Sequence, residues 1–219
     1  MRPQKYAILF IYLLSALSSG ITEAYCYFYR GGAFANIQVG NLVLGGVSLL
    51  RRDWAAAFRY FCLPLAFAVG LLLSMALFRL SRTGVACPAM APFLEALLLF
   101  LSPFFPREMD LAANLLLSAA AGIQLCCLSG FLKKHFPSTG CAEWTQLMEA
   151  AGLTVRDTRR NGWLQAVTFG AGLLLGSHLV TQWGLFAVWG GAIPLLICFP
   201  CMVIALFFRD IPFPNSSVL

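Results

Sequence analysis

Apolar runs separated by short polar or basic stretches occupy almost the whole chain. They cover residues 6–29, 33–50, 60–80, 89–106, 111–132, 138–152, 163–180 and 184–208. A helix that crosses a bilayer needs about 20 mainly apolar residues, and six of the runs reach or approach that length. The runs at 33–50 and 138–152 are either short tilted spans or re-entrant helices. The pattern predicts an all-α polytopic membrane protein with about eight membrane helices.

Composition agrees with this prediction. Of the 219 residues, 60% are hydrophobic and only 11% are charged, whereas a soluble domain is about half apolar and a quarter charged. The net charge of +6 comes from Lys and Arg in short clusters between the apolar runs. Such clusters set the topology of membrane proteins, so the expected partner is the lipid bilayer and not nucleic acid.

The basic clusters also predict an orientation. With the N-terminus inside, either six or eight crossings place ten Lys and Arg residues inside and five outside. The excess of positive charge marks the cytoplasmic side. Both termini are therefore expected to be cytoplasmic.

The chain also repeats itself with an offset of 102 residues. Gly20, Phe67, Gly70, Pro92 and Phe105 fall on Gly122, Phe169, Gly172, Pro194 and Phe207. We interpret residues 5–106 and 107–208 as two copies of one four-segment membrane unit, an arrangement common in transporters. Eight crossings would make the copies parallel and six would make them inverted. The equally basic linkers 51–59 and 153–161 favour parallel copies slightly.

Polar residues inside the apolar runs are the candidate functional residues. They are Glu23, Asn36, Gln38, Gly40 and Asn41 near the start, followed by Glu95 and Gln124. An unpaired carboxylate at mid-bilayer is disfavoured by a few kcal/mol or more, so each must be paired, protonated or in contact with water. One interpretation makes these residues a substrate or proton pathway, with Gly40 and Asn41 at a broken helix. The other makes them a hydrogen-bond network that only joins helices.

Other chemistry has weak support in the sequence. Cys198 and Cys201 have C-x-x-C spacing but lack the soluble βαβ setting of redox motifs. His135 and His178 are far apart and lack metal-ligand spacing. No hydrolase, nucleotide-binding or metalloprotease motif is present. We therefore expect neither an enzyme nor a cofactor or metal site.

The polar stretch resembles a known family. Gly20-x-x-Glu23-Ala24, followed by Gly32-x-Phe34-x-Asn36-x-x-Gly40-Asn41, is similar to the opening motif of the YoaK-like family, and Gly122-Ile123-Gln124 is similar to its second feature. Glu23 stands where the family commonly has Asp. These are bacterial inner-membrane proteins of uncharacterised function, so the resemblance implies a multi-pass fold in the inner membrane.

Two functions are compatible with these features. The first is an inner-membrane transporter or channel for a small solute, with proton coupling through Glu23 or Glu95. The second is a non-transporting scaffold or regulatory partner whose polar residues serve packing. The sequence leaves the solute and the oligomeric state open.

Overall fold

The computed structural model describes residues 3–80, 86–135 and 162–207, and these segments form helices joined by short connections. The helices are α1 (Pro3–Tyr29), α2 (Gln38–Leu50), α3 (Trp54–Leu80), α4 (Ala86–Leu101), α5 (Asp110–His135), α7 (Gly162–Trp183) and α8 (Trp189–Phe207). Short 3-10 turns, η1 (Ser102–Phe104), η2 (Arg107–Met109) and η4 (Gly184–Val188), join α4 to α5 and α7 to α8. The apolar run expected at 138–152 lies outside the described residues.

Four stretches of the described chain are long and apolar enough to cross a membrane. They are Leu9–Tyr29, Trp54–Ala76, Arg107–Cys126 and Trp163–Ile204, and the last contains both α7 and α8. Gln38–Leu50 and Met90–Phe104 are shorter apolar helices. Many apolar side chains of the long stretches are exposed, for example Leu65 at 66% and Leu174 at 77%, while Glu23 and Arg30 are fully buried. Apolar outer surfaces and buried polar groups indicate a membrane protein.

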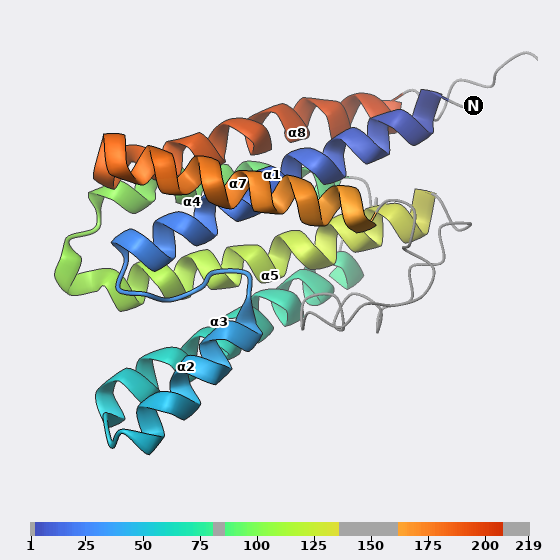
Figure 1. The fold of residues 1–219 in the computed structure, drawn as a ribbon. Helices are drawn as coiled ribbons and strands as arrows, with labels where there is room; N and C mark the ends of the chain where they lie inside the picture. The colour runs from blue at the N-terminus through green and yellow to red at the C-terminus, as the bar shows by residue number, and fades with distance from the viewer. Residues whose placement is uncertain (1–2, 81–85, 136–161, 208–219) are drawn as a thin grey trace, which may run out of the picture.

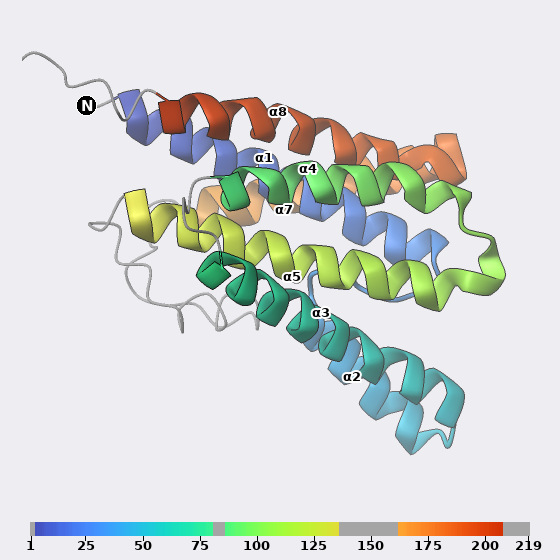
Figure 2. The ribbon, with the colours of Figure 1, turned by 180° about the vertical axis from the view of Figure 1, so that it is seen from behind.

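Five of the described helices form a bundle and two leave it. In Figures 1 and 2, the axes of α1, α4, α5, α7 and α8 are roughly aligned, some helices running one way and some the other, whereas the pair α2 and α3 diverges from them. We call the end of the bundle where residues 102–109 connect α4 to α5 the hairpin end. Helices α1, α4 and α7 finish there, and α5 and α8 begin there (Figure 1). The indole of Trp189 at the start of α8 donates to the carbonyl of Phe100 near the end of α4, at 3.1 Å.

Helices α1 and α7 meet at glycines. A Cβ on Gly20 would overlap the carbonyl of Phe169 and lie 2.8 Å from the nitrogen of Leu173. A Cβ on Gly172 would lie 2.5 Å from the carbonyl oxygen of Leu17. Any larger residue would push the two backbones apart, and small residues at helix contacts allow such an approach in lipid.

Helices α3 and α5 meet in the same manner. A Cβ on Gly70 would overlap the carbonyl of Ala119. A Cβ on Gly122 would overlap the carbonyl of Phe67 and lie 3.0 Å from the nitrogen of Leu71. This contact attaches the diverging pair of helices, α2 and α3, to the bundle.

The main apolar core lies beside these contacts. It combines residues of α1, α4, α5, η4 and α8 with one residue of the loop before α2: Tyr25, Cys26, Ala35, Ala96, Leu99, Leu117, Ala187, Val188, Ala192 and Leu195. A loop residue in this core means that the chain between α1 and α2 runs inside the protein.

Candidate functional site

The chain turns back into the bundle after α1. We call residues 31–37 the return loop. Gly31 and Gly32 have φ values of 79° and 73°, a backbone region that glycine enters without steric cost. The loop then runs back alongside α5 before α2 begins at Gln38 (Figure 1). An irregular backbone in such a position must find hydrogen bonds within the protein.

Glu23 supplies three of these bonds. Its side chain is fully buried on α1. Oε2 accepts from the backbone N–H of Ala35 at 3.1 Å, and Oε1 accepts from Asn36 and from Ile37, the latter at 2.9 Å. The carboxylate therefore holds the three residues that precede α2.

Asn41 holds the other side of the return loop. Its Oδ1 accepts from the N–H of Phe34 at 2.9 Å, and its Nδ2 donates to the carbonyl of Phe34 at 2.8 Å. Nδ2 also donates to Oε1 of Gln38 at 3.0 Å, while Nε2 of Gln38 donates to the carbonyl of Ala35 at 2.6 Å. The hydroxyl of Ser118 on α5 reaches the same carbonyl at 3.1 Å.

These contacts satisfy the backbone of residues 34–37 completely. The two groups still to be accounted for, the carbonyls of Asn36 and Ile37, accept from the N–H groups of Gln38 and Gly40. Buried backbone groups are almost always paired, and here side chains from α1, α2 and α5 do the pairing. Gly40 is needed because a Cβ there would lie 2.7 Å from the ring of Phe34.

A second group of predicted residues keeps unpaired polar atoms. Glu95 on α4 is 3% exposed, and its Oε2 has no hydrogen-bond partner within the described part of the chain. The same holds for Nε2 of Gln124 on α5, which is 7% exposed, and for Nδ2 of Asn36. The structure thus divides the predicted residues into two sets. Glu23, Gln38, Gly40 and Asn41 build the return loop, while Asn36, Glu95 and Gln124 retain free bonding capacity.

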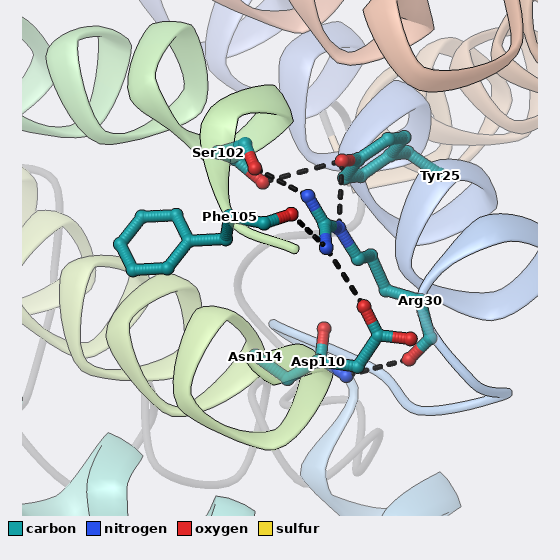
Figure 3. Close-up of polar contacts among 6 residues, drawn as sticks. All are labelled: Tyr25, Arg30, Ser102, Phe105, Asp110 and Asn114. Atoms are coloured by element: carbon teal, nitrogen blue, oxygen red, sulfur yellow. Dashed lines mark hydrogen bonds and ion pairs between the residues drawn. The ribbon is translucent and has the colours of Figure 1, made fainter. Parts of the chain in front are cut away.

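A third cluster, at the hairpin end, was not predicted as a unit (Figure 3). The fully buried guanidinium of Arg30 donates to Asp110 at 2.7 Å, to the hydroxyl of Tyr25 at 2.8 Å and to the carbonyls of Phe105 and Ser102. Burial disfavours the charge, but the bonds to Asp110 and Tyr25 outweigh it and raise the pKa of Arg30 above its usual value. Arg30 therefore stays charged and joins α1, η1 and α5.

Asn114 completes this cluster. Its Nδ2 donates to the carbonyl of Arg30 at 2.7 Å, so α5 holds both the side chain and the backbone of that residue. The sequence contains one signal for this ion pair: Arg30 directly follows one apolar run, and Asp110 directly precedes another. Two of the partners of Arg30 are backbone carbonyls, which no side-chain pattern reveals.

Comparison with known families places the chain in one of them. The model of a family described as "Protein of unknown function (DUF1275)" matches residues 11–201. The chain belongs to this family. Membership is consistent with the resemblance to YoaK-like proteins, and it brings no established activity. No curated protein and no solved structure matches the chain.

The DUF1275 match, residues 11–201, includes the Glu23 and Arg30 clusters as well as Glu95 and Gln124. Chemically, the Glu23 cluster can hold a broken helix in place, and the Arg30 cluster can close one end of the bundle. Of the residues predicted from the sequence, Glu95, Gln124 and Asn36 keep buried polar atoms that have no partner among the described residues, and Thr22, Arg59 and Asn114 each keep one as well. Within the described residues, no group of three His, Cys, Asp or Glu side chains could hold a metal ion.

Proposed function

We propose that this protein is a transporter for a small solute, built from two inverted halves in the bacterial inner membrane with both termini cytoplasmic. Helix direction supports the inverted arrangement. α1 and α5, which are equivalent by the offset of 102 residues, run in opposite directions in Figures 1 and 2. The same is true of α3 and α7 and of α4 and α8. Six helices then cross the membrane, and α2 enters and leaves on one side.

The glycine contacts give independent support for two equivalent halves. Gly20 on α1 faces Phe169 and Leu173 on α7. By the offset of 102 residues, the equivalent of Gly20 is Gly122 on α5, and the equivalents of its two partners are Phe67 and Leu71 on α3. Gly122 does face Phe67 and Leu71. The contact between Gly172 and Leu17 corresponds in the same manner to that between Gly70 and Ala119. Each half thus packs its first helix against the third helix of the other half.

The observation that carries the proposal is the return loop with α2. Transporters of inverted-repeat design use interrupted helices near the bilayer midplane, where the helix ends and the unwound backbone meet solute and ions. Here Glu23 anchors the interruption, and Glu95 is the carboxylate free to carry a proton. An intramembrane carboxylate without a partner is a functional candidate by default. Asn36 and Gln124 are the candidate solute contacts.

The test is transport by purified protein in liposomes. Currents are recorded on solid-supported membranes under a pH gradient while amino acids, sugars and organic acids are added in turn. Wild-type protein should give a solute-dependent current, and Glu95→Gln should abolish it because the glutamine cannot exchange a proton. Equal currents from wild-type protein and Glu95→Gln would reject the proton role of Glu95. No current above protein-free liposomes would reject transport.

One observation favours the second candidate, a scaffold or regulatory partner that moves no solute. Both oxygens of Glu23 are bonded within the chain, as expected of a residue that serves only structure. A scaffold predicts that a partner copurifies from membranes and that Glu95→Gln leaves every flux unchanged.

A further inference from the structure

Arg59, near the start of α3, carries a positive charge that is not paired with a carboxylate among the described residues. Its guanidinium lies against the return loop, because a Cβ on Gly31 would be only 3.0 Å from its Nη1. Nη2 donates to the hydroxyl of the neighbouring Tyr60 at 3.1 Å, and the guanidinium carbon lies 4.9 Å from the centre of that ring. The side chain is half-buried, so the group is fixed by its surroundings and still reaches the surface.

Asp110, an acidic residue close to the guanidinium of Arg59, is already paired with another arginine. Oδ2 of Asp110 would lie 3.9 Å from the same Cβ on Gly31, yet Asp110 forms its ion pair with Arg30, at 2.7 Å. Among the described residues no carboxylate forms an ion pair with Arg59, and its buried Nε has no hydrogen-bond partner. A guanidinium carries five N–H donors.

Such a charge calls for a counter-ion. Arg59 lies within an apolar stretch, Trp54–Ala76, that is long enough to cross a membrane, and an uncompensated charge in such surroundings is strongly disfavoured. A third arginine, Arg107, lies over the ring of Tyr29 at 4.7 Å and adds positive potential at the same end of the bundle. Arg30, Arg59 and Arg107 are opposed here by Asp110 and the exposed Glu108, so three positive and two negative charges leave this end positive.

We propose that Arg59 and the hydroxyl of Tyr60 form a binding site for an oxyanion at the mouth of the return loop. The planar guanidinium matches a phosphate or carboxylate in a two-bond geometry, and the hydroxyl can supply a third contact. The phosphate can come from an anionic lipid headgroup or from a free solute. Exposed Trp54 and Phe58, on the first turns of the same helix, suit the headgroup region of a bilayer. The site stands whether or not the protein transports.

The test measures the melting temperature of purified full-length protein in neutral detergent. Three additions are compared at equal ionic strength: phosphatidylglycerol, phosphatidylcholine and inorganic phosphate. A ligand at a hundred-fold excess over its Kd should raise the Tm by about 5–10 °C. Stabilisation by phosphatidylglycerol alone identifies a lipid site, and stabilisation by inorganic phosphate identifies a site for free anions.

Variants separate this site from general charge effects. Arg59→Gln should abolish the shift, whereas Arg51→Gln, which removes one exposed positive charge at the α2–α3 turn, should keep it. With Tyr60→Phe, a several-fold higher ligand concentration should be needed to reach the same Tm shift. If Arg59→Gln does not fold, Arg59→Lys keeps the charge without the planar fork and should weaken binding while Arg51→Gln does not. Equal shifts in Arg59 and Arg51 variants, or no shift with either anion, would overturn the proposal.

Discussion

Replacing Glu23 with glutamine tests whether this carboxylate holds the return loop. Oε1 of the glutamine can keep the two bonds to Asn36 and Ile37, but its amide nitrogen would take the place of Oε2 and face the N–H of Ala35. One buried N–H then has no acceptor, which costs about 1–3 kcal/mol. Two charge-assisted bonds become neutral, with a loss of about 1 kcal/mol each.

The expected destabilisation is therefore about 3–5 kcal/mol, which lowers the Tm of a chain of this size by about 10 °C. The assay is thermal unfolding of the purified protein in detergent, followed by tryptophan fluorescence. Glu108→Gln is the matched control, because it makes the same chemical change at an exposed position in η2 and should leave the Tm unchanged. A Glu23→Gln protein as stable as the control would refute the anchoring role.

Three further predictions use the same assay. Asp110→Asn leaves the buried arginine of the hairpin end without its anion and should cost about 3–5 kcal/mol. Gly172→Ala drives a methyl group into the backbone of α1 and should cost about 1–3 kcal/mol, whereas Gly170→Ala, where a Cβ meets nothing within 4 Å, should cost nothing. Glu95→Gln removes a carboxylate whose Oε2 is unpartnered and should not lower the Tm, in contrast to Glu23→Gln.

The helices could be predicted from the sequence because apolar runs of sufficient length have little alternative in lipid. Their ends were predicted less well where side chains decide them. The run expected to begin at residue 33 becomes helical only at Gln38, because Glu23 and Asn41 bond the backbone of residues 34–37 in a non-helical form. Nothing in the local hydrophobic pattern shows that a residue on the preceding helix will do this.

The grouping of Glu23, Gln38 and Asn41 could be predicted from their cost in an apolar setting. Their partners could not, because Glu23 bonds backbone N–H groups and Asn41 bonds mainly the backbone of Phe34, and no pattern of side chains in the sequence indicates such bonds. The difference between Glu95, whose Oε2 lacks a hydrogen-bond partner among the described residues, and Glu23, which has three partners, also depends on the fold. Its sequence neighbourhood is as apolar as that of Glu23, and only tertiary packing leaves its Oε2 without a partner.

In the inverted arrangement, α2 returns to the side of the membrane from which the chain entered. Asp53 lies between α2 and α3 and Gln182 lies at the end of α7, and both are exposed. In Figure 1 the connection between α2 and α3 and the end of α7 are both on the side of the hairpin end. Each is replaced by cysteine in turn, and intact cells and inverted vesicles are treated with a membrane-impermeant maleimide, with the unsubstituted protein reporting the native cysteines. The inverted six-span arrangement predicts that both positions are labelled from the same side. Labelling from opposite sides would mean that α2 crosses the membrane and would rule out the inverted six-span arrangement.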